Sequence, residues 1–229
     1  MRRAILLVLL ALAGCTPRTT IPESDRHRAI EELSGQRRFL RVAAYVGPLF
    51  GDRTRLLLSD APPGELDLLE SPAGDPIRPP APTEILPPGT TVRVRALEFP
   101  TGMIIASRPL MTPRYHPWVY LDISGHDLAA VLVLSQAVSS YDDVRAEIDR
   151  VLATDDPTAA FQALPKAQRE AIARKEPSEG MGLRALVMAW GYPEKKIIDR
   201  PSGSEEWIWS GGKRRAFFQG ERLMRWEPR

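Results

Sequence analysis

The chain has 229 residues, with 31 lysines and arginines against 29 acidic residues, so its formal net charge at pH 7 is only +2. Two of the arginines lie in a leader that we expect to be removed. The remaining balance of 29 basic against 29 acidic residues excludes a general electrostatic attraction to nucleic acid. A single cysteine excludes an internal disulfide. A hydrophobic fraction of 43% is enough for one or two packed domains.

Residues 1–14 have the pattern of a secretory signal peptide. Two arginines precede an apolar run over residues 4–12, which is too short to span roughly 30 Å of hydrocarbon as a permanent helix. The run ends in Leu12-Ala13-Gly14-Cys15, which resembles the lipobox of bacterial lipoproteins. The resemblance implies cleavage before Cys15 and acylation of its sulfur and new amino group, with palmitate as a typical acyl chain. We expect no cofactor other than this covalent lipid.

Residues 15–36 are expected to form a tether between the lipid and the first folded domain. Residues 16–28 lack apolar periodicity, and a short helix can follow near residues 29–33. Thr16, rather than an aspartate, follows the cysteine. By analogy with enterobacterial sorting, this favours the outer membrane, with the protein facing the periplasm and the lipid bilayer as its first partner.

Residues 37–136 have a β pattern. Short strand-like segments separated by Gly, Pro and Asp turns occur at residues 37–46, 54–59, 65–69, 90–97, 118–123 and 128–134. Val92 and Val94 alternate with Arg93 and Arg95, which predicts a strand with one buried and one wet face. Six short strands predict a small all-β barrel or sandwich. The Pro-Gly-Thr-x-Val-x-Val sequence at residues 88–94 resembles bacterial SH3-like barrels.

Residues 137–229 change to a pattern of helices followed by strands. Ser139 or Ser140 can cap a helix with an apolar face, Pro157 can start a second, and a third spans roughly residues 182–190. Strands are predicted at residues 206–209, 214–218 and 222–226, the last two joined by a tight turn. We therefore expect an α+β chain in which two to three helices of this region pack on a three-stranded antiparallel sheet.

The C-terminal fifty residues also carry an ordered series of motifs. The series is Gly180-Met181, then Val-Met-Ala-Trp-Gly-Tyr-Pro at residues 187–193, Glu-Glu-Trp-Ile-Trp at 205–209 and Phe-Phe-Gln-Gly at 217–220. It resembles the SmpA/OmlA-type lipoprotein domain, whose known member is an accessory subunit of the outer-membrane β-barrel assembly machinery. Trp209 and Gln219 stand where that family usually has tyrosine and asparagine. The resemblance implies a small α/β domain and a role in envelope assembly, and it does not extend to residues 37–136.

The sequence shows no arrangement typical of an enzyme. His27 lies in the tether, while His116 and His126 flank residues 118–123 with a spacing that fits no zinc pattern. The chain lacks the motifs of a serine-hydrolase elbow, a phosphate loop and a calcium loop. Two adjacent acidic pairs fall at predicted helix starts, where the helix dipole explains them, and Glu205-Glu206 is expected to close a polar loop. We therefore expect no catalytic residue and no metal site.

Aromatic residues concentrate near the C-terminus, where four of the five tryptophans lie in the last forty residues. The candidate partner-binding residues are Trp207, Trp209, Phe217, Phe218 and Arg222. Because side chains alternate along a strand, the two tryptophans share one face of the sheet. If that face is exposed, it is a partner surface; the alternative is that all the rings belong to the core.

Three functions stay open at this point, none of them involving nucleic acid. The leading one is a non-catalytic lipid-anchored lipoprotein that binds an envelope protein as a scaffold component, in outer-membrane assembly. The alternative is an SH3-like module that binds cell-wall peptide or glycan, that is, peptidoglycan, along Arg93, Arg95 and Trp118. A hydrolase or transferase would need His116 and His126 to converge with carboxylates.

Overall fold

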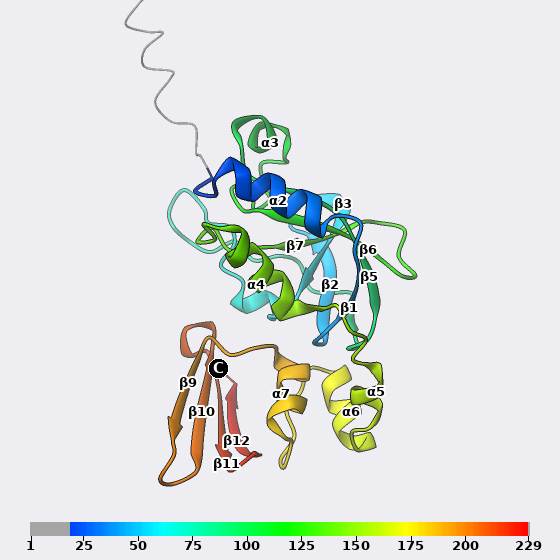
Figure 1. Cartoon of the computed structure of the whole chain (residues 1–229). Helices are drawn as coiled ribbons and strands as arrows, with labels where there is room; N and C mark the ends of the chain where they lie inside the picture. Colours follow the sequence, from blue (N-terminus) through cyan, green and yellow to red (C-terminus); the bar gives the residue numbers. More distant parts are fainter. Residues whose placement is uncertain (1–18, 229) are drawn as a thin grey trace, which may run out of the picture.

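Two β-sheets and six α-helices form residues 19–228, the part of the chain that the computed structural model describes. The larger sheet has eight strands in the order β4-β2-β3-β7-β6-β5-β1-β8, and the smaller has four in the order β12-β11-β10-β9. The two sheets lie at opposite ends of the molecule (Figure 1). The chain is therefore α+β, as its sequence predicts.

The larger sheet is built almost entirely from antiparallel pairs. Its strands are β1 (Arg37–Leu40), β2 (Ala44–Leu49), β3 (Asp52–Ser59), β4 (Glu84–Leu86), β5 (Thr91–Glu98), β6 (Trp118–Ile123), β7 (Ala130–Val133) and β8 (Leu152–Ala153). The exception is β3, which runs parallel to β7 with Leu56 opposite Ala130. Along β5, Val92 and Val94 are buried while Arg93 and Arg95 are exposed, so the predicted alternation is confirmed.

Two helices cover one face of this sheet. They are α2 (Glu23–Leu33) and α4 (Tyr141–Val151), which also contact each other. The Ser140 hydroxyl accepts a hydrogen bond from the Asp143 backbone N–H at 3.2 Å and caps α4, as predicted. The opposite face is covered by the segment between β3 and β4, where Leu66 and Ile77 pack against a cluster around Trp118. The larger sheet therefore has apolar cover on both faces.

The structure corrects the expected tether. Ile21 is buried, the Thr20 hydroxyl donates to the Val138 carbonyl at 3.0 Å, and α2 begins at Glu23. The described chain is thus folded from its first residues on, and only residues 15–18 of the predicted tether lie outside the described part. Residues 65–69, predicted as a strand, form instead the end of a short 3₁₀ turn (Pro63–Glu65) and irregular chain.

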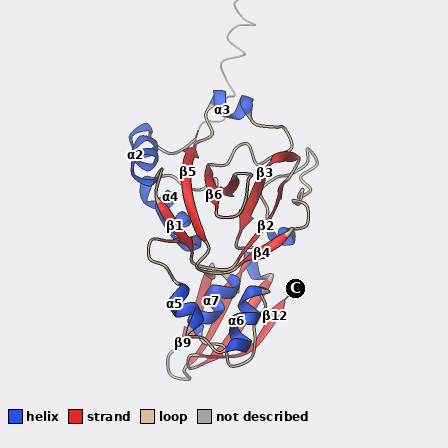
Figure 2. Ribbon diagram, turned by 90° about the vertical axis from the view of Figure 1, so that its right-hand side faces the viewer, coloured by secondary structure: helices blue, strands red, loops and turns tan. Residues whose placement is uncertain are grey.

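The C-terminal part packs helices on one face of the smaller sheet (Figure 2). The helices are α5 (Thr158–Gln162), α6 (Lys166–Ala173) and α7 (Leu183–Trp190), and the strands are β9 (Lys195–Asp199), β10 (Ser204–Trp209), β11 (Arg214–Gln219) and β12 (Arg222–Pro228). Strands β10, β11 and β12 lie where the sequence predicts them. The sheet has four strands rather than three because β9 adds to the edge of β10. The domain boundary expected at residue 136 is wrong. Helix α4 packs on the larger sheet and strand β8 pairs with β1 of that sheet, although both follow residue 136 in the chain.

Candidate functional site

The predicted lipidation site lies outside the described residues. This applies to Cys15 and to the lipobox residues Leu12, Ala13 and Gly14. The described chain begins at Thr19, at the end of the molecule that carries the short helix α3 (Gly102–Ser107) and away from the smaller sheet (Figures 1 and 2). Among the described helices, none combines the length and the apolar character needed to cross a membrane.

The aromatic cluster of the C-terminal sheet is core, not surface. Trp207, Trp209 and Phe218 are each at most 3% exposed. The Trp207 ring lies 4.8 Å from that of Phe218, and the Trp209 ring stands edge-on to Trp190 of α7 at 5.2 Å. The helices close over this row because the sheet must bury one apolar face. This placement corrects the expectation that these three side chains form an accessible partner surface.

The indole N–H groups in this core are also satisfied internally. Trp190 donates to the Lys175 carbonyl at 3.1 Å, and Trp209 donates to the Gly191 carbonyl at 3.2 Å. Trp207 donates to a Glu205 carboxylate oxygen at 2.8 Å. A buried indole needs such a partner, so these hydrogen bonds fix the ring positions. The cluster is a structural unit.

Two of the five predicted partner residues remain accessible. Phe217 and Arg222 lie on the opposite, uncovered face of the smaller sheet, where Phe217 is half-buried and Arg222 is exposed. The Arg225 guanidinium lies 3.6 Å from the centre of the Phe217 ring, and Arg215 pairs with Glu206 at 3.1 Å. The uncovered face therefore combines one aromatic ring with charges of both signs.

A buried polar cluster joins the two sheets. The Lys175 ammonium group donates to the Ala43 carbonyl at 2.5 Å and to the Ala189 carbonyl at 2.8 Å. Burial lowers the pKa of Lys175 to about 7. Nearby, Arg214 pairs with Glu65 at 2.9 Å, with both side chains nearly buried. These contacts tie the smaller sheet to the larger part of the molecule and leave no access for a substrate to Lys175.

The residues of the predicted cell-wall groove separate in the structure. Trp118 is buried and lies under the Arg108 guanidinium, which is 3.9 Å from its ring centre. Arg93 is exposed and lines a hollow of about 450 Å³ with Arg37 and Asp122. Arg95 reaches Asp122 at 3.9 Å. Trp118 therefore does not belong to this hollow, whose lining combines these charged side chains with Val92 and Ile123.

The two histidines of the β region do not converge. His116 is buried with its Nδ1 2.8 Å from the Leu134 carbonyl, and burial lowers its pKa. His126 instead lies near the surface, with its Nε2 2.6 Å from a Glu84 oxygen. Among residues 19–228, no three side chains of the metal-ligating types are grouped so that they could hold an ion.

No family model, curated protein sequence or solved structure matches this chain.

Proposed function

We propose that this chain is a non-catalytic lipoprotein, anchored to the outer membrane by lipid on Cys15 and facing the periplasm, that serves as a binding or scaffold component of outer-membrane assembly. The observation that carries the proposal is the lone cysteine at the end of Leu12-Ala13-Gly14-Cys15, after a charged start and a short apolar run. The packing of Thr20 and Ile21 into the folded body, a few residues after this segment, supports it.

The C-terminal motifs support the assembly role by meeting in one substructure. The Gly180 N–H donates to the Leu223 carbonyl at 2.8 Å, and the Leu223 N–H donates to the Met181 carbonyl at 2.9 Å, so the segment before α7 extends the β12 edge. The Trp207 and Trp209 row then fills the space under α7. A small helix-on-sheet unit of this kind is what the SmpA/OmlA resemblance implies.

The accessible Phe217 and Arg222 mark the face that we assign to an envelope protein partner. An aromatic ring held under an arginine offers apolar area and a cation at one place, which are features enriched at protein interfaces. Strands β11 and β12, which carry this face, lie at the far end of the molecule from the start of the described chain (Figure 1), so a lipid-anchored chain would present the face to the periplasm.

The test combines lipid labelling with cross-linking in intact cells. We expect labelled palmitate on the wild-type chain and none on Cys15→Ser, which should leave the membrane fraction. Photo-cross-linkers at positions 217 and 222 should yield adducts with an envelope protein, whereas the same group at the exposed control position 128 should not. Absence of palmitate, or the same adducts from all three positions, would contradict the proposal.

A second candidate function is binding of cell-wall peptide or glycan by an SH3-like module at residues 37–136. The antiparallel succession of β5, β6 and β7 supports an SH3-like layout, while the parallel pairing of β3 with β7 departs from it. The hollow beside Arg37 and Arg93 places charged groups next to apolar lining from Val92 and Ile123, a combination that suits a peptide or sugar ligand. If this function is real, the full chain should sediment with purified peptidoglycan and the Arg93→Ala variant should not. Equal sedimentation of both would exclude the hollow as the binding site.

A further inference from the structure

The loop between β5 and β6 exposes an unusual amount of apolar surface. Within residues 101–117, Met103 is 84% exposed, Leu110 77%, Met111 52% and Tyr115 46%. Folded proteins expose single apolar side chains routinely, but here four large ones are exposed within one short segment. We call residues 101–117 the apolar loop.

The apolar loop is held in place by buried polar side chains, chiefly Arg108 and Thr112. Arg108 is buried and donates to the Arg114 carbonyl at 3.0 Å and to the His116 carbonyl at 2.7 Å. Its guanidinium also pairs with Glu98 at 3.3 Å. The buried Thr112 hydroxyl donates to the Pro109 carbonyl at 2.7 Å. These bonds fix the backbone from beneath.

Arg108 and Thr112 are buried together with Ile105, while Met103, Leu110, Met111 and Tyr115 face outward. The Gly51 N–H donates to the Met111 carbonyl at 3.1 Å, so the exposed Met111 is also anchored to the turn between β2 and β3. Apolar side chains that a fixed backbone holds in water gain no hydrophobic free energy. The same side chains gain it when they enter an apolar environment, so this segment is suited to such a contact.

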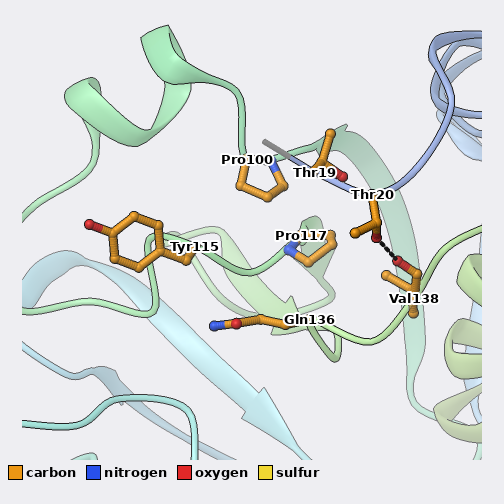
Figure 3. A pocket seen from close by; sticks show the side chains of 7 residues that line it. All are labelled: Thr19, Thr20, Pro100, Tyr115, Pro117, Gln136 and Val138. Carbon is orange, nitrogen blue, oxygen red and sulfur yellow. Dashed lines mark hydrogen bonds between the residues drawn. The ribbon is translucent and has the colours of Figure 1, made fainter. Parts of the chain in front are cut away.

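The first described residues lie beside the apolar loop and close in sequence to Cys15, which indicates that the apolar environment is the bilayer. Thr19 and Thr20 line a hollow of about 390 Å³ together with Pro100 and Tyr115 of the loop region (Figure 3). Four residue steps separate Cys15 from Thr19, and a fully extended chain covers at most about 14 Å in that number. A lipid on Cys15 therefore keeps this end of the molecule against the bilayer surface.

We propose that the apolar loop inserts its Met103, Leu110, Met111 and Tyr115 side chains into the interfacial region of the bilayer that holds Cys15. The inference rests on the proposed lipid anchor. Insertion gives the anchored body a second attachment point, since flexible methionine fits the irregular acyl boundary and tyrosine carries a polar tip for the headgroups. The loop thereby sets the orientation of the molecule and directs the smaller sheet away from the membrane.

Depth-dependent quenching tests the proposal on the full lipidated chain. Cys15 is blocked by its lipid, so Met103→Cys or Leu110→Cys supplies one free thiol for a fluorophore. The protein is reconstituted in vesicles of phosphatidylethanolamine and phosphatidylglycerol that contain a nitroxide lipid. Met224→Cys, an exposed methionine on the smaller sheet, is the matched control. We expect several-fold stronger quenching at positions 103 and 110 than at 224.

A charge variant separates insertion from mere proximity. With the fluorophore at position 110, Met103→Asp should weaken the quenching, while Met224→Asp should leave it unchanged. Because Met103 is almost fully exposed, the fold should persist, which far-UV circular dichroism checks.

The experiment distinguishes a wrong insertion proposal from a wrong lipid-anchor proposal. Vesicles that carry the lipidated protein, but with equal weak quenching at 103, 110 and 224, would overturn the insertion alone. If the wild-type chain purified from membranes carries no lipid and does not float with the vesicles, both the insertion and the proposed function are wrong. If the thiol at position 103 is shielded from a water-soluble maleimide in cells yet unquenched in vesicles, a protein covers the loop and the proposal is wrong.

Discussion

Replacing Trp207 by alanine separates a structural from a binding role for the aromatic cluster. The side chain is 2% exposed, and its ring lies 4.8 Å from Phe218 and 6.0 Å from Trp209. The Lys196 ammonium group lies 4.0 Å from the ring centre. Removing the indole deletes these contacts and leaves a cavity that the sheet and α7 can close only in part. We expect the free energy of unfolding to fall by about 3–5 kcal/mol.

Equilibrium urea unfolding, followed by circular dichroism because the change removes a fluorophore, measures this loss. With a denaturant slope of about 2–3 kcal/mol per molar urea, the midpoint should fall by about 1–2.5 M. The matched control is Phe217→Ala on the uncovered face, which should cost about 1 kcal/mol or less. Equal midpoints for both variants, with cross-linking to an envelope protein lost only in Trp207→Ala, would refute the core assignment.

Three further predictions concern the buried polar groups and one helix cap. Lys175 has a pKa of about 7 in the folded chain, below its unfolded value of about 10.4, so the unfolded state binds more protons between these values. The free energy of unfolding should therefore rise from about pH 7.5 to 9.5, by at most about 1.4 kcal/mol per pH unit, and a rise that persists in Lys175→Met would contradict this. Glu65→Gln leaves Arg214 nearly buried without its counter-charge and should cost about 3 kcal/mol in urea unfolding; an unchanged midpoint would show that the pair contributes nothing. Ser140→Ala removes the hydrogen bond to the Asp143 N–H, and calorimetry should show a loss of about 1 kcal/mol, whereas no change in Tm would mean that the cap is dispensable.

Local patterns predicted the elements that have one wet and one buried face. The alternation of Val92 and Val94 with two arginines defines β5, and the serine before Tyr141 defines the start of α4. Strand β9 was missed because all its residues are exposed at a sheet edge, where Ile197 and Ile198 follow two lysines without alternation. Helix α2 was missed in part because its sequence is mostly charged and only Ala29 and Leu33 are buried.

The candidate site depends on tertiary packing, which a strand pattern does not contain. Alternation placed Trp207 and Trp209 on one face of β10, but the position of α7 decides that this face is the buried one. The apolar loop was overlooked because its residues match neither helical nor strand periodicity over a useful length. Its signal is visible only when the burial of Arg108 is seen together with the exposure of Met103.

The most direct test of the account is mass spectrometry of the N-terminal peptide of the protein purified from membranes. If the sulfur of Cys15 anchors the chain, the first residue is Cys15, carrying a diacylglyceryl thioether and an acylated amino group. A peptide that begins at Met1, or one with an unmodified thiol at Cys15, would contradict the lipid anchor, the assigned location and the membrane contact of the apolar loop together.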